Sequence, residues 1–182
     1  RAAVCTIPVE PPPAAPVPTA PVSPDDDAFL EDFQKRSFQY FWDHTNPGNG
    51  LTLDRASATG EPKPKSHNSY NIASSGASGF ALTGYCIAAD RGWVPRQQAI
   101  ERTRNALDFF ANRAPQERGW FYHWMDYETG ARRWNSEVSS IDTALLLGGV
   151  LSAKHCFKDN AEIVRLADQI YKKVDFDWML NK

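Results

Sequence analysis

The chain has 182 residues, 42% of them hydrophobic, 12% aromatic and 23% charged, a composition that suits one folded domain. Its 20 Lys and Arg residues and 22 Asp and Glu residues leave a net charge of −2. This balance excludes the strongly basic surface of a typical nucleic-acid-binding protein, and no apolar run is long enough to predict a transmembrane helix. Three cysteines are too few for a disulfide-held scaffold. The many aromatic residues can pack in a core or stack on sugars or bases.

Proline is concentrated at the N-terminus, where eight of the 13 prolines fall within residues 1–24. Because proline fixes φ and removes backbone donors, this segment is predicted to be a disordered, extended tether. Cys5 follows the small residues Ala2, Ala3 and Val4, a pattern that resembles the start of a mature bacterial lipoprotein. It predicts export to the periplasm or cell surface and a membrane tether through a lipidated Cys5. The alternative is a plain disordered tail with an incidental cysteine.

The rest of the chain, residues 25–182, is predicted to be mostly helical. Aromatic residues at helical spacing predict a helix over 28–44, with the three aspartates at 25–27 as its cap. An Asn-Pro-Gly-Asn-Gly sequence ends it, and 46–75 is predicted to be a long loop of the kind that is often functional. The following helix, 76–91, is small and apolar almost all round, so we expect protein on every side of it.

A second set of elements follows the first buried helix. Residues 95–113 are predicted to form an amphipathic helix, and 119–134 a β-hairpin, because aromatic residues alternate there before a turn sequence. A second buried helix is expected over 140–157 and a last amphipathic helix over 161–174. The expected N-caps of these two helices are Ser139 or Ser140 for the first and Asn160 for the second.

Buried and half-exposed helices therefore alternate along the chain. This alternation is what two concentric layers of helices would produce, with inner helices that touch protein on both sides and outer helices that face solvent. The fold class is predicted to be all-α, part of an α/α toroid with a small β-hairpin insertion. An ordinary helical bundle or a solenoid is the alternative, although no fixed-length repeat supports a solenoid.

Two acidic residues flank the start of the second buried helix. Glu137 lies just before this helix, and Asp142 lies in its first turn. In a toroid the inner helices begin at the central cavity, so both carboxylates would face a ligand there. The alternatives are that Asp142 is a first-turn charge that stabilises the helix start, and that Glu137 is a charged loop residue at the surface.

The predicted hairpin carries a second group of candidate residues. Alternation places one set of side chains on one face and a second set on the other: Trp120, Tyr122 and Trp124 against Phe121, His123 and Met125. Either face could form a wall that stacks sugar rings, with His123 or Asp126 hydrogen-bonding sugar hydroxyls. The alternative is a hairpin that packs in the core around a satisfied histidine. No second His or Cys lies at a ligand spacing from His123, so no metal site is predicted.

Two further pairs of residues stand outside these groups. Asp54 and Arg55 lie in the predicted loop, where they either pair with each other to order it or hydrogen-bond a substrate. Cys86 and Cys156 fall in the two predicted buried helices, and they are interpreted as small core residues.

Several motifs in a fixed order carry a family resemblance that extends from Phe29 to Leu180. They are FLEDFQKRSFQYFW, NPGNGLTLDR, SSGASGFALTGY, RGW, GWFYHWMD, SEVSSIDTALLLGG and VDFDWML. With these motifs the chain resembles a bacterial family labelled "putative glucoamylase", which is related to the endo-β-1,2-glucanases. The resemblance implies an (α/α)6 barrel that hydrolyses glucosidic bonds with inversion, and it implies no cofactor. The implied substrate is a glucan oligo- or polysaccharide, either β-1,2-linked or an α-glucan.

Hydrolysis of a glycosidic bond generally needs one carboxylic acid to protonate the leaving oxygen and one carboxylate to activate water. Glu137, next to Trp134 and the aromatic hairpin, is expected to be the acid, with a pKa raised by burial. The family's domain is longer than this chain, so we expect the water-activating base outside it. A non-catalytic carbohydrate-binding module or a helical scaffold is the alternative. The residues expected to bind substrate are Asp54, Arg55, Trp120, Tyr122, His123, Asp126 and Asp142.

Overall fold

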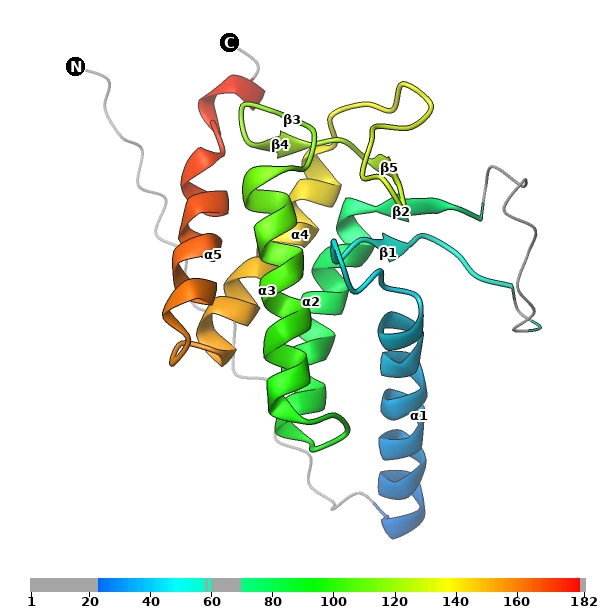
Figure 1. Cartoon of the computed structure of the whole chain (residues 1–182). Helices are drawn as coiled ribbons and strands as arrows, with labels where there is room; N and C mark the ends of the chain where they lie inside the picture. The colour runs from blue at the N-terminus through cyan, green and yellow to red at the C-terminus, as the bar shows by residue number, and fades with distance from the viewer. Residues whose placement is uncertain (1–22, 58, 60–69, 181–182) are drawn as a thin grey trace, which may run out of the picture.

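The computed structural model describes residues 23–57, 59 and 70–180, and it is mostly helical with small sheets, as predicted (Figure 1). The Pro-rich segment with Cys5, and much of the loop predicted over 46–75, lie outside the described residues. No helix within the described residues combines the length and apolarity needed to cross a bilayer. The helices are α1 (Pro24–Asp43), α2 (Ser75–Asp90), α3 (Arg96–Asn112), α4 (Ser140–Cys156) and α5 (Ala161–Lys173), followed by a short 3-10 helix, Asp177–Met179. The strands are β1 (Thr52–Leu53), β2 (Ile72–Ser74), β3 (Gln116–Glu117), β4 (Trp120–Phe121) and β5 (Trp124–Asp126).

Side-chain caps set where most of the helices begin. The Ser139 hydroxyl accepts the backbone N–H of Asp142 at the start of α4, and Asn160 caps α5 in the same way, as predicted. At α1 the prediction was wrong, because Ser23 is the cap and Pro24 opens the first turn. The three aspartates at 25–27 lie within that turn, where their negative charge still stabilises the helix start.

The two helices α2 and α4 run parallel and are in close contact. Gly76 near the start of α2 faces Asp142 near the start of α4, and Cys86 near the end of α2 contacts Ser152 near the end of α4. Between these points the backbones approach so closely that a Cβ added at Gly149 would lie 2.1 Å from the carbonyl oxygen of Gly79. Only glycine on both helices permits this distance.

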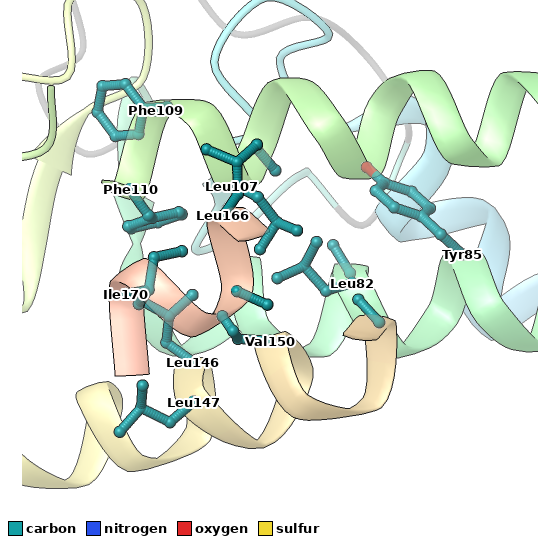
Figure 2. Close-up of a cluster of buried hydrophobic side chains, with 14 of the residues drawn as sticks. Leu82, Tyr85, Leu107, Phe109, Phe110, Leu146, Leu147, Val150, Leu166 and Ile170 are labelled. Carbon is teal, nitrogen blue, oxygen red and sulfur yellow. The ribbon is translucent and has the colours of Figure 1, made fainter. Parts of the chain in front are cut away.

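A second layer, made of α3 and α5, covers one side of the α2–α4 pair (Figure 1). Figure 2 shows the apolar cluster between the layers, to which each of the four helices contributes. Its fully buried members include Leu82 of α2, Leu107 of α3, Leu146 and Val150 of α4, and Leu166 and Ile170 of α5. The expected alternation of inner and outer helices is thus present, and α1 packs beside α2.

The expectation that α2 and α4 are surrounded by protein on every side was wrong for this chain. Phe80 on α2 is 54% exposed and Ile141 on α4 is 70% exposed, and Phe33 on α1 is also exposed. The reason is that α3 and α5 cover one side of the α2–α4 pair, while the opposite side has no second layer among the described residues. Apolar residues that lie on the open side of these helices are therefore exposed, although their sequence is apolar almost all round.

The strands pair differently from the predicted hairpin. β5 is antiparallel to β2, with Ala73 opposite Met125, and β2 also pairs with β1, so these strands form one three-stranded sheet. The predicted return strand before Trp134 contributes a single bridge, Arg132 to Met125. β4 instead forms a small hairpin with the preceding β3. The hairpin prediction missed this pairing because β2, the partner of β5, lies in the segment predicted to be a loop.

The close helix contact predicts a large difference between two neighbouring glycines of α4. Gly149→Ala should lower the free energy of unfolding by about 2–3 kcal/mol, because its methyl group would meet the Gly79 carbonyl. Gly148→Ala is the matched control, since no atom lies within 4 Å of its added Cβ. It should be neutral or stabilise by up to about 1 kcal/mol through helix propensity. Equal effects of the two changes in denaturant unfolding would contradict this packing.

Candidate functional site

The candidate site lies at the end of the helical pair where α2 and α4 begin (Figure 1). Its central residue, His123, lies between β4 and β5 and is held by backbone hydrogen bonds on both sides. Its N–H donates to the Glu137 carbonyl at 3.1 Å, and its carbonyl accepts the N–H of Ser75, the first residue of α2, at 3.3 Å. The chain therefore fixes this residue between the start of α2 and the segment that leads into α4.

The imidazole of His123 bridges the two predicted carboxylates. Its Nδ1 lies 2.8 Å from Oε1 of Glu137, and its Nε2 lies 3.7 Å from Oδ2 of Asp142. The ring also stacks on Trp124, with 3.7 Å between the ring centroids. The three residues that the sequence singled out in two separate motifs thus form one cluster, and the aromatic stack holds the orientation of the imidazole.

Asp142 also links the starts of the two parallel helices. It accepts hydrogen bonds from the hydroxyls of Ser139 at 2.6 Å and Ser74 at 3.3 Å, and these serines are the N-caps of α4 and α2. The side chain is largely buried. Asp142 is therefore a structural residue of the helix starts as well as a neighbour of His123.

Asp54 and Arg55, just after β1, form the ion pair that was one of the two predicted alternatives. Two guanidinium nitrogens of Arg55 lie 2.6 and 2.8 Å from Oδ2 of Asp54. The same guanidinium lies 5.9 Å from the centroid of the Trp124 ring, within the range of a cation–π contact. The pair therefore belongs to the cluster through Trp124.

Trp134 is the exposed aromatic residue of the cluster. Its indole is 51% exposed and stands edge-on to Trp124, with 6.1 Å between ring centroids. Trp134 and Asn135 have φ values of 55° and 50°, a left-handed conformation that costs residues with a side chain about 1–2 kcal/mol each. Arg132 stabilises this bend by donating to the carbonyls of Asn135 and Ser136.

The expected pKa shift of Glu137 was wrong in direction. Its side chain is 65% exposed instead of buried. A hydrogen bond from its own backbone N–H and one from His123 lower its pKa below the ordinary value, and the Arg132 charge acts in the same direction. Glu137 is therefore an ionised carboxylate at neutral pH in this chain.

Three residues that were predicted to bind substrate make no described contact with the imidazole of His123 or with its two carboxylates. They are Trp120, Asp126 and Tyr122. Trp120 is buried, and its indole N–H donates to the Asp175 carbonyl at 2.8 Å. Asp126 closes a turn by accepting the N–H groups of residues 128 and 129. Burial would raise its pKa, but these bonds and the Arg133 charge lower it. Tyr122 lies under the guanidinium of Arg132, 4.2 Å away.

Trp124 and Trp134 are site residues that were not among those expected to bind substrate. Trp124 was predicted only as part of a possible aromatic wall, and Trp134 only as a neighbour of Glu137. Trp124 had the same alternation as Trp120, so spacing alone could not say which of them is buried. Trp134 follows two arginines in a segment predicted to be a strand. Its backbone is left-handed, a conformation that glycine usually signals in a sequence, and no glycine stands there. Among the described residues, no group of three or more His, Cys, Asp or Glu side chains could hold a metal ion.

The hydrogen bond between His123 and Glu137 predicts a measurable change in the pKa of Glu137 when the imidazole is replaced. In His123→Phe the ring can still stack on Trp124 but no longer donates to Glu137, so the pKa of Glu137 should rise toward its ordinary value. Carboxyl 13C NMR titration measures this shift. The matched control is Asp168, whose pKa is lowered by Lys154 and should not move in the same variant. An unchanged Glu137 titration would show that the imidazole hydrogen bond does not act on it.

Similar known proteins include enzymes named for β-1,2-linked glucans and proteins named "putative glucoamylase", although no family model matches the chain. The exo-β-1,2-glucooligosaccharide sophorohydrolase (non-reducing end) of Parabacteroides distasonis is 22% identical over 162 residues, which make up 84% of this chain and 21% of that protein. The endo-β-1,2-glucanase of Chitinophaga pinensis, solved with sophorotriose and glucose, is 27% identical with a TM-score of 0.72, over 84% of this chain and 37% of the other.

A protein of Bacteroides fragilis named "putative glucoamylase" is 30% identical with a TM-score of 0.70, over 90% of this chain and 39% of the other. The chain thus spans about a fifth of the curated relative and less than two fifths of these solved relatives. The matches nevertheless cover most of the chain, in agreement with the resemblance derived from the motifs. The chain is a partial homologue of the β-1,2-glucanases and of the proteins named "putative glucoamylase".

Proposed function

We propose that this chain is the part of a glucan hydrolase that binds a β-1,2-linked glucan at the His123 cluster. The observation that carries the proposal is an exposed indole, Trp134, that stands edge-on to Trp124. The other face of this contact is His123, which stacks on Trp124 and bridges two carboxylates. An aromatic face stacks on the apolar side of a sugar ring, while carboxylates and imidazole nitrogens hydrogen-bond its hydroxyls. The β-1,2 linkage is favoured because two of the relatives are named for it.

Within this proposal Glu137 is one of the two catalytic carboxylates. Its lowered pKa suits a carboxylate that activates water better than an acid that must keep its proton, so the base role replaces the acid role expected from the sequence. Asp142 contacts the opposite nitrogen of the same imidazole and is held by the hydroxyls of Ser139 and Ser74, so in this proposal it positions His123.

The proposed stacking surface can be tested by binding. Trp134→Ala should weaken the binding of a β-1,2-linked gluco-oligosaccharide, measured by calorimetry, about tenfold or more, because it removes the exposed aromatic face. The matched control is Trp178→Ala, which removes an indole of similar exposure at the C-terminal 3-10 helix. Equal affinities of the two variants would refute the proposed surface. Preference for an α-1,4-linked oligosaccharide would keep a glucan site but overturn the linkage.

The catalytic role can be tested by hydrolysis with the protein expressed from its complete reading frame. Glu137→Gln should reduce the release of reducing ends from β-1,2-glucan by about 10²- to 10⁴-fold. A water-activating base is needed whatever the leaving group. The hydrolysis of an aryl glucoside with a good leaving group should therefore fall by the same factor. Near-normal hydrolysis of the aryl substrate alone would assign Glu137 as the acid. Full activity on both substrates would exclude Glu137 from the chemistry.

A further inference from the structure

Cys86 and Cys156 lie at the end of the α2–α4 pair that is remote from the His123 cluster. The helices are parallel, and Cys86 and Cys156 each lie seven residues beyond the glycines that bring the backbones into contact, Gly79 and Gly149. Seven residues are about two helical turns, so both cysteines return to the same facing sides of the two helices.

The contacts of the two thiols agree with this register. The Cys86 thiol lies 3.7 Å from the Ser152 carbonyl, one turn before Cys156 on α4, and both cysteines line the same surface hollow. No disulfide joins them, and both are free thiols. Two thiols on the facing sides of a closely packed helix pair need little rearrangement to reach the geometry of a disulfide.

We propose that Cys86 and Cys156 form a reversible redox site, in which thiol–disulfide exchange with a small disulfide oxidant such as oxidised glutathione joins α2 to α4. The two cysteines differ in access. Cys86 is 9% exposed, whereas Cys156 is partly exposed and lines a surface hollow with Arg96, His155 and Lys158. Asp90 lines the same hollow, and Arg96 is also paired with Asp159, so Lys158 supplies the main positive charge for the carboxylates of oxidised glutathione.

Because Cys156 is more exposed to solvent than Cys86, we expect it to react first in the exchange. The Cys156 thiolate attacks one sulfur of the oxidant, so one thiol leaves and a mixed disulfide remains on Cys156. The Cys86 thiol then loses its proton to solvent and attacks the Cys156 sulfur, which releases the second thiol. The protein loses two hydrogens and two electrons, and one disulfide oxidant becomes two thiols. Burial and the neighbouring thiol raise the pKa of Cys86, so it acts second.

The cross-link should act on stability and not on the candidate site. It closes a long loop of chain, which constrains the unfolded state, and it lies at the opposite end of α2 and α4 from Ser74 and Asp142. We therefore expect oxidation to raise the melting temperature by roughly 10 °C and a reducing agent to reverse the change.

The test uses the whole chain with Cys5→Ser, so that only the two helix cysteines remain. After incubation with oxidised glutathione, intact mass spectrometry should show the loss of two hydrogens and no bound glutathione, together with the rise in melting temperature. The control is the same chain with Cys86→Ser, where Cys156 should keep one glutathione and the melting temperature should not rise. Two free thiols, or a separate glutathione on each cysteine, would overturn the proposal.

Discussion

The close parallel contact between α2 and α4 is the constraint on which the rest of the structure depends. Gly79 and Gly149 leave no room for a side chain between the two backbones, so the helices hold one register. This register brings the two N-caps, Ser74 and Ser139, close enough for Asp142 to accept a hydrogen bond from each. The backbone of His123 then connects the start of α2 to the segment before α4, and the site is assembled there.

Most helices could be predicted from the sequence, because their ends carry local signals. Asn160, Ser139 and the Gly-rich turns mark boundaries that act over a few residues, and the structure places these helix ends within about one residue of the prediction. Strands β1 and β2 were not predicted, since they have only two and three residues. The pairing of β2 with β5 depends on contacts between segments about fifty residues apart, which no local pattern reveals.

The candidate site was predicted in pieces. Glu137, Asp142 and His123 could be selected because polar residues stood beside buried elements, but nothing in the sequence indicated that one imidazole would bridge both carboxylates. The burial of Trp120 and the exposure of Trp134 could not be derived from alternation, because a left-handed bend without glycine turns the second indole outward. Glu137 is exposed, and hydrogen bonds from its own backbone and from His123 lower its pKa, opposite to the expected direction.

The parallel course of α2 and α4 also has an electrostatic consequence. The dipoles of antiparallel neighbours largely cancel, but those of two parallel helices add, so both positive ends meet beside His123. The negative end of α4 is met by Lys154 and His155 in its last turn. The combined field favours anions at the site. A ligand that develops negative charge on an oxygen at this end would therefore be stabilised by the backbone itself, before any side chain takes part.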